Sequence, residues 1–327
     1  MSSNIDSLFY GKATIAFHEH EGESSAGLEE AFIQTTALGN GFTLQAGRFY
    51  SAMGYLNEQH EHAWDFADAP LIYRGLFGDQ YSDDGLQFVY IAPTDIFLQF
   101  GAEAFSGKSY PSSGEHSGVG AWTIFTSLGG DIGIEHSWQF GLSSWQASDV
   151  DARSSAEHMH DGASSETPLF SGSSEINALD FVYKWAANGN PQRQHFKFQF
   201  EYFERKENGI VSLLNSGPPE ELTYYRGTQS GWYTQLIYQF IPHWRSGLRY
   251  DNLSSDNWGE DADVISEAGL DDEGISPERY SVMLEWLPSE YSRVRLQYNR
   301  DDSYMESDNQ VFVQYTVSLG SHGAHQY

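Results

Sequence analysis

The chain has 327 residues, no cysteine and a formal net charge of −29, with 46 acidic against 17 basic residues. This balance excludes a nucleic-acid partner, because phosphate binding needs a basic surface, and it makes divalent cations the natural charged partners. Without cysteine the chain forms neither a disulfide nor a thiolate metal site.

Aromatic content and hydropathy together favour a membrane β-barrel. Aromatic residues make up 15% of the chain, yet its mean hydropathy is −0.50. These values conflict for an ordinary globular domain but agree for a barrel, whose strands alternate lipid-facing apolar and lumen-facing polar residues. No apolar run approaches the roughly 20 residues of a membrane helix. The first residues, Met1 to Asp6, contain no signal peptide, so we expect a mature or shortened form of an exported protein.

A period of two recurs along the chain, and this period indicates strands with one apolar and one polar face. Residues 195–204 alternate in this way, as do 231–240, 280–286 and 310–319. The apolar face of the first segment holds Phe196, Phe198, Phe200 and Tyr202, and that of the last holds Val311, Val313, Tyr315, Val317 and Leu319. The alternation predicts β-strands from end to end.

Short connections alternate with long ones. The short ones carry Gly, Asn and Pro, as tight turns require, and lie at 38–41, 93–95, 128–131, 188–191, 241–243 and 287–290. The long polar segments are 19–25, 50–84, 105–117, 145–174, 207–227, 252–276 and 301–308. Short turns on one side and long loops on the other are the pattern of outer-membrane barrels.

These connections predict an all-β fold, an antiparallel up-and-down transmembrane barrel of about 14 strands, each about 9 to 13 residues long. Asn4 to Ser7 reads like one more tight turn, so a longer form of the chain would have about 16 strands, an even number as such barrels require. We expect residues 1–320 to form the barrel, with long outer loops at 50–84, 145–174, 207–227 and 252–276, and 321–327 to form a periplasmic tail. A soluble β-sandwich or a solenoid is the alternative, but sandwich strands usually have about 5 or 6 residues and no fixed repeat period appears.

Six of the 12 histidines form three His-x-His triplets, which the predicted topology places on the outer side of the membrane. The triplets are His18-Glu19-His20, His60-Glu61-His62 and His158-Met159-His160. In extended backbone two imidazoles at i and i+2 point the same way and can share one ion, and imidazole with carboxylate suits Zn²⁺, or Cu²⁺ or Ni²⁺. Asp161 and His116 are further candidate ligands. The alternative is that these are solvated loop histidines, and one site or several both fit the pattern.

Charge is distributed unevenly. Segment 252–276 is acidic and has no Lys or Arg, so it predicts either a vestibule that concentrates cations or a loop that bridges lipopolysaccharide through Ca²⁺ or Mg²⁺. The predicted lumen face carries both signs, which allows a water-filled eyelet or a ladder of internal ion pairs. Its charged residues are Lys12, Lys184, Lys197, Arg245, Arg249, Arg293 and Arg295 with Glu103, Glu135, Asp180, Glu201 and Glu285.

Segment 50–84 is long enough to fold into the lumen as a constriction, and its Trp64, Phe66, Tyr73 and Phe77 indicate that it packs against other residues. Arg48 shares the parity of apolar neighbours in its strand. Contact with lipid headgroups or a β-bulge would explain that position.

Two motifs resemble those of a known family. Residues 46–66 contain Ala46-Gly47-Arg48-Phe49, then Gly54-Tyr55-Leu56-Asn57-Glu58-Gln59-His60 and His62-Ala63-Trp64-Asp65-Phe66, and the chain ends Ser318-Leu319-Gly320-Ser321-His322-Gly323-Ala324-His325. Together they resemble a family of porin-like outer-membrane proteins linked to zinc, often labelled zinc-regulated TonB-dependent outer-membrane receptors, over most of the chain. The resemblance implies an outer-membrane location and a role in zinc acquisition, with His60, His62, His322 and His325 inside the matching motifs. The sequence shows no plug domain or TonB box, which departs from that label.

The sequence therefore predicts a porin or channel in the outer membrane of a Gram-negative cell, in contact with outer-membrane lipid and lipopolysaccharide. It would pass small solutes, prefer cations and capture Zn²⁺. The second hypothesis is a surface metal-binding or adhesion barrel with a closed lumen and no transport. The third is an outer-membrane hydrolase, but residues 141–145 lack the glycine that ends a nucleophile elbow, so we predict no enzyme activity and no catalytic residue.

Overall fold

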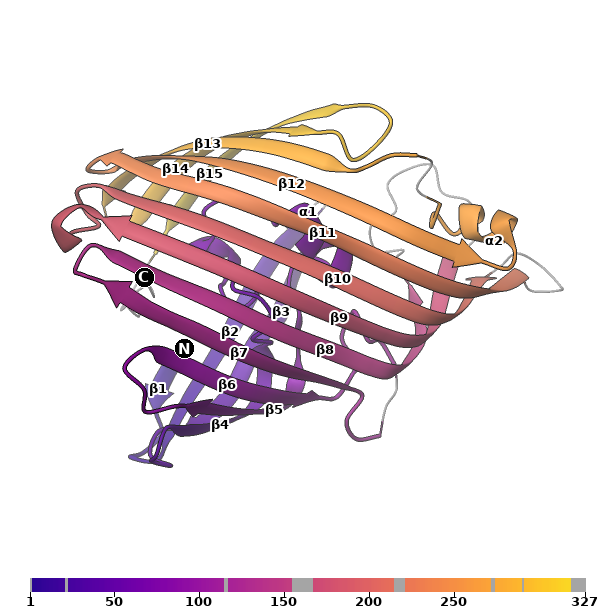
Figure 1. The fold of residues 1–327 in the computed structure, drawn as a ribbon, viewed down its shortest axis with the longest axis horizontal. Helices are drawn as coiled ribbons and strands as arrows, with labels where there is room; N and C mark the ends of the chain where they lie inside the picture. Colours follow the sequence, from indigo (N-terminus) through magenta and orange to yellow (C-terminus); the bar gives the residue numbers. More distant parts are fainter. Residues whose placement is uncertain are drawn as a thin grey trace.

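The computed structural model contains fifteen antiparallel strands in a single sheet, in which each strand pairs with the next along the chain (Figure 1). It describes residues 2–20, 23–114, 117–154, 167–214, 221–271, 274–289 and 291–318, without the side chains of 18–20 and 23–25. The up-and-down order confirms the predicted fold, because consecutive strands joined by turns and loops pair directly. In the described chain, no helix is both long and apolar enough to cross a membrane.

The strands are β1 (Ser2–Asn4), β2 (Phe9–His20), β3 (Glu23–Thr35), β4 (Phe42–Tyr50), β5 (Ser82–Ile91), β6 (Phe97–Phe105), β7 (Ala121–Ile132), β8 (His136–Ser154), β9 (Thr167–Ala186), β10 (His195–Leu214), β11 (Glu221–Ile241), β12 (Trp244–Gly259), β13 (Glu278–Ser289), β14 (Ser292–Asp301) and β15 (Asp308–Val317). The helical segments are η1 (Glu61–Ala63), α1 (Leu71–Phe77), η3 (Ala187–Gly189) and α2 (Ala262–Glu267).

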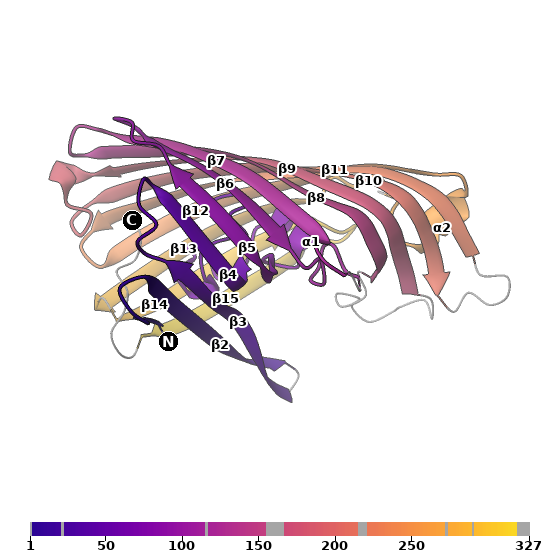
Figure 2. The ribbon, with the colours of Figure 1, turned by 90° about the horizontal axis from the view of Figure 1, so that it is seen from below.

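The sheet curls into a barrel, and α1 lies inside its curve (Figures 1 and 2). Short β1 pairs with β2 across residues 5–8, which confirms the turn predicted at Asn4 to Ser7. Among the described residues the sheet ends at β1 and β15, which are not hydrogen-bonded to each other.

The outer face of the sheet is apolar and many wall residues of the interior are polar, which is the reverse of a soluble protein. Val313 of β15 is 77% exposed, whereas Gln199 and Glu201 of β10 are 0% exposed. Exposed apolar side chains also follow the outward faces of β4, β5, β13 and β14, where a strand alternates its faces residue by residue. The apolar outer face suits lipid, and the polar side chains are turned to the interior.

Several predicted boundaries are wrong. Gly129, Gly130 and Asp131 lie inside β7 and pair with β8, and the turn falls at 133–135 because β7 continues through the glycines. Strands β8 to β11 have 19 to 21 residues rather than about 9 to 13. Much of segments 145–174 and 207–227 is therefore strand. Their alternate residues, such as Val211 and Leu213, are buried inside the barrel, so these longer strands pack against the interior over their added length.

Arg48 is explained by its neighbour. It lies opposite Asp84 in the register of β4 and β5, and Arg48 Nε donates to Asp84 Oδ1 over 3.0 Å. The pair stands on the outer face next to the long-loop end. A cross-strand ion pair, rather than a bulge at Arg48, accounts for the charge among apolar residues.

Candidate functional site

The connection between β4 and β5, residues 51–81, folds into the barrel instead of standing outside it. Its apolar side chains form a core with residues of the inner wall. The ring of Tyr73 meets that of Phe203 edge-on at 5.1 Å, and Phe77 packs against the same ring at 5.6 Å. The predicted inward fold is thereby confirmed, because its aromatic residues are buried only inside the lumen. We call residues 51–81 the inner loop.

Two wall carboxylates hold the first part of the inner loop. Glu103 of β6 accepts hydrogen bonds from Ala52 N at 2.9 Å and Ser51 Oγ at 2.5 Å. Glu201 of β10 accepts from Tyr55 N at 3.0 Å and from Leu56 N at 3.1 Å. These contacts satisfy backbone donors that would otherwise be buried without partners.

Further along, the polarity reverses and the inner loop supplies the carboxylates. Asp65 Oδ2 lies 3.0 Å from Lys197 Nζ, and its Oδ1 lies 3.0 Å from Arg245 Nη1. The backbone carbonyl of Trp64 accepts from Arg295 Nη2 at 2.7 Å. Burial alone would raise the pKa of Asp65, but Lys197 and Arg245 outweigh it and hold that pKa well below its usual range.

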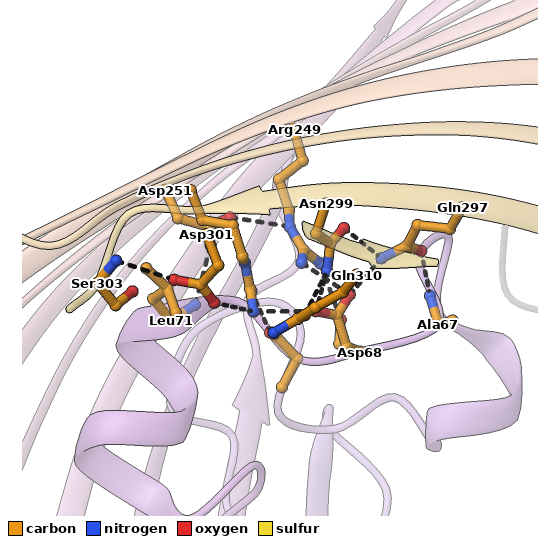
Figure 3. Close-up of polar contacts among 12 residues, drawn as sticks. Ala67, Asp68, Leu71, Arg249, Asp251, Gln297, Asn299, Asp301, Ser303 and Gln310 are labelled. Atoms are coloured by element: carbon orange, nitrogen blue, oxygen red, sulfur yellow. Dashed lines mark hydrogen bonds and ion pairs between the residues drawn. The ribbon is translucent and has the colours of Figure 1, made fainter. Parts of the chain in front are cut away.

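Asp68 is the most highly connected residue of the inner loop. Its Oδ1 accepts from Arg249 Nη2 at 2.8 Å and from Gln297 Nε2 at 2.6 Å, and its Oδ2 lies 2.9 Å from Arg279 Nη1. Figure 3 shows Asp68 beneath Arg249, with Gln297 and Asn299 directed toward it. Burial would raise the pKa of Asp68, but Arg249 and Arg279 lower it to about 2.

The wall also caps α1. Asp251 of β12 accepts from Leu71 N, the first residue of α1, at 2.9 Å, as Figure 3 shows. Arg249 Nε reaches the other carboxylate oxygen of Asp251 at 3.0 Å. A carboxylate at a helix N-terminus satisfies a free backbone donor. We call Asp68, Arg249, Asp251 and Arg279 the arginine latch.

Of the two sequence alternatives for the lumen charges, the structure forms a ladder of internal ion pairs along β12 to β14. Glu285 joins it through Arg245 at 2.5 Å and Arg295 at 2.7 Å. Asp68, Asp251 and Arg279 were missing from the predicted set. Arg279 has the lumen parity of Ser281 and Glu285, so parity was a signal that could have found it, whereas nothing in the sequence places Asp68 beside it.

A cavity of about 2540 Å³ lies inside the barrel between the inner loop and the short connections. Residues of the short connections, such as Ile134, Asn190, Pro242 and Tyr291, line it, so it opens toward the short-turn end of the barrel. Its charged lining residues are Lys12, Lys184, Lys197, Arg193, Arg245 and Arg293 with Glu58, Asp65, Asp131, Glu135 and Asp180. These signs nearly balance, in contrast to the strong negative charge of the whole chain.

His60 and His62 lie in the inner loop and line the cavity, so their expected place on the outer surface is wrong. The apolar residues around them carry the segment into the lumen. His60 Nε2 lies 2.7 Å from Glu30 Oε2 and 3.0 Å from Lys12 Nζ, and the His60 and His62 rings stack at 5.4 Å.

The other predicted metal ligands are not brought together by the described residues. The backbones of His18 and His20 end β2 on the long-loop side, and their side chains lie outside the described part. So do His116, His158, His160, Asp161, His322 and His325. Within the described ranges, no group of three His, Asp or Glu side chains is arranged to hold a metal ion.

Segment 252–276 is partly ordered into secondary structure. β12 continues to Gly259, and α2 follows with Asp261 accepting from Asp263 N at 3.0 Å. Val264 and Ile265 of α2 are buried and join the inner core. The segment is therefore in part a packed cap, although Asp272 and Glu273 lie outside the described residues.

Comparison with known proteins supports the fold. No family model matches the chain. An uncharacterized protein of Aquifex aeolicus is 27% identical over an alignment 349 residues long. The alignment covers 99% of this chain and 67% of that protein. The outer membrane channel DcaP of Acinetobacter baumannii superposes with a TM-score of 0.58 at 14% identity, over 97% of this chain and 83% of DcaP. A loop L8 deletion mutant of OmpT, an outer membrane protein of Vibrio cholerae, gives 0.57 at 10% identity, over 97% of this chain and 87% of that one.

These likenesses and the apolar outer face show an outer-membrane β-barrel. The zinc-linked resemblance gains no support from them.

The arginine latch predicts the effect of Asp68→Asn. Removing one charge from a buried pair leaves Arg249 and Arg279 undercompensated, a loss of about 3–5 kcal/mol in comparable sites. We expect the inner loop to open more often, so that trypsin cleaves after Arg74 at least tenfold faster in the refolded barrel.

Asp79→Asn is the matched control, because Asp79 lies in the same loop outside the latch. Equal cleavage rates in wild type and Asp68→Asn would show that the latch does not hold the loop.

The pKa of Asp68 predicts how the latch responds to acid. That pKa is about 2, below the usual value of about 3.9, so the ionised carboxylate stabilises the fold above pH 4 and this contribution is lost as the pH falls through about 2. Hydrogen exchange of residues 71–77, corrected for intrinsic rates, should show constant protection from pH 7 to 4 and a loss near pH 2. A loss of protection already at pH 5 would contradict this assignment.

Proposed function

We propose that this protein is an outer-membrane channel for small polar solutes, whose passage the inner loop restricts. The observation that carries the proposal is the cavity of about 2540 Å³ inside the barrel, bounded by the inner loop and open toward the short turns. Its polar and charged lining suits hydrated solutes rather than lipid. The channel fold of DcaP is consistent with this role.

Selectivity in this proposal arises mainly at the outer side. The chain has a net charge of −29, whereas the cavity lining is nearly balanced, so much of the negative charge lies elsewhere. Acidic outer segments would raise the local concentration of cations, including Ca²⁺ or Mg²⁺ shared with lipopolysaccharide. We therefore propose a moderate cation preference that screening removes.

The alternative is a surface or adhesion barrel with a closed lumen. The apolar core around α1 favours it, because this core fills that part of the lumen. A hydrolase is the third. A conductance measurement distinguishes the channel from the closed barrel, and a peptide or lipid cleavage assay tests for a hydrolase.

We also propose zinc capture as a narrower role of the cavity. The supporting observation is the stacked His60 and His62 beside Glu30, because imidazole and carboxylate are zinc ligands. His60 would have to exchange its contact with Lys12 for the ion. His18 and His20 end β2 on the long-loop side, so they and the other histidines named from the sequence would belong to separate zinc sites in this proposal.

The channel proposal predicts discrete conductance steps from the refolded barrel in planar bilayers. Asp65→Asn with Asp68→Asn should enlarge the steps, because the inner loop loses its anchors, whereas Asp79→Asn should not. Cation preference should fall between about 0.1 M and 1 M KCl, as the Debye length shrinks from about 10 Å to about 3 Å. Absence of steps in both wild type and the double variant would favour the closed barrel.

The zinc proposal predicts micromolar or tighter Zn²⁺ binding by titration calorimetry. His60→Ala with His62→Ala should weaken it at least tenfold, because imidazole is a direct ligand. His136→Ala is the control, since His136 lines the cavity near the short turns and contacts Tyr183. Binding that is absent, or equal in the double variant, would remove zinc from the role of these residues.

A further inference from the structure

Four carboxylates that face the lumen have no ion pair with a Lys, Arg or His among the described residues, although Glu207 of β10 pairs with Arg153 of β8. Among the described residues, ion pairs involve Asp65, Asp68 and Glu285 near β12 to β14, but not Glu58, Glu103, Asp180 or Glu201. Glu103 and Glu201 accept hydrogen bonds from the inner loop. Asp180 and Glu58 are left, and both line the cavity.

Asp180 is unusual because its carboxylate is buried without a counter-charge. It is only 5% exposed, and its Oδ1 has no hydrogen-bond partner. Glu201 lies directly opposite it on β10, and Glu58 lines the same cavity. Like charges directly opposite on neighbouring strands repel, and a buried carboxylate without a partner is costly. The position therefore lacks a cationic hydrogen-bond donor.

A second buried polar atom without a partner lies beside the first. Ser143 of β8 lines the cavity, and its Oγ makes no hydrogen bond. Ser143 lies opposite Ala178, and Asp180 lies opposite Gly141, so the two side chains are diagonal neighbours on the lumen face. Such neighbours are about 7–8 Å apart, close enough to contact one small group.

An aromatic ring completes this part of the wall. Phe125 of β7 lies opposite Ser143 and lines the cavity. A Cβ at Gly101 would come within 2.0 Å of the Phe125 ring, and a Cβ at Gly141 within 2.1 Å of Asp180 Oδ2. The two glycines thus let the ring and the carboxylate lie against the wall, where bulkier residues would push them away.

We propose that Glu58, Phe125, Ser143 and Asp180 form a binding site for the ammonium group of a small organic amine. An ammonium carries three donors, which match the carboxylates of Asp180 and Glu58 and the hydroxyl of Ser143. An aromatic ring beside a carboxylate is a favourable setting for an organic cation. A bare metal ion fits less well at this site, because only Glu58 and Asp180 of the four residues are common metal ligands and no imidazole is among them.

This site deepens the proposed function, on which it rests for the route by which an amine enters and leaves. It gives the channel a substrate class, namely amines small enough for the cavity. Binding itself is measurable without transport, so the two proposals can fail separately.

The test is titration calorimetry of the refolded full chain with n-butylammonium at fixed ionic strength. n-Butanol and butyrate are the neutral and anionic probes. We expect butylammonium alone to bind, Asp180→Asn to weaken it at least tenfold, as expected for loss of a charged hydrogen-bond partner, and Ser143→Ala to weaken it less. Asp131→Asn is the matched control, because Asp131 lines the same cavity at the end of β7.

Heat-modifiable mobility on gels should show every variant folded, and Ser143→Ala provides the test if Asp180→Asn does not fold. Equal affinity in wild type and both site variants would overturn the site, as would displacement of butylammonium by an equal concentration of K⁺. Amine binding without conductance would leave the site standing and refute the channel. Conductance without amine binding would support the channel and refute the amine site.

Discussion

The charge pairing between the inner loop and the barrel wall is the interaction on which the rest of the structure depends. A sheet of this many strands encloses more space than its own side chains fill. Residues 51–81 enter that space, and Asp65 and Asp68 meet the wall cations of β10 to β14. Without the inner loop, Arg245 would keep only Glu285, and Arg249 would keep only Asp251. The buried cations would then outnumber their carboxylate partners, which costs several kcal/mol in comparable sites.

The inner loop also meets the wall in two chemically different ways. Near β12 to β14, charges of opposite sign neutralise one another and fix the path of the inner loop. On the side of β6 to β10, Glu103 and Glu201 bind backbone amides, and Asp180 is left without a partner. The same loop therefore occupies part of the lumen and leaves beside it a cavity of about 2540 Å³ that Asp180 lines.

Glycines in the strands decide where some lumen-facing side chains of the wall can lie. Gly101 and Gly141 leave space for Phe125 and Asp180, and the alternation of each strand directs those side chains inward. On the outer face the same alternation presents apolar residues, and Arg48 is accommodated there by Asp84. The alternation of side chains along each strand thus gives the barrel an apolar face toward lipid and a polar face toward the lumen.

The sequence by itself determined the barrel, its up-and-down order and the inward packing of residues 51–81, because these features follow from local period, turn residues and aromatic content. The predicted long segment 19–25 is wrong, since β2 reaches His20 and β3 begins at Glu23. Only the tertiary structure decided that β8 to β11 extend to 19–21 residues, that His60 lies inside the lumen, and that Asp68 meets Arg249 and Arg279. Both arginines follow Asp68 by about 180 residues or more in the chain, and no local pattern encodes which distant strand a loop carboxylate will reach.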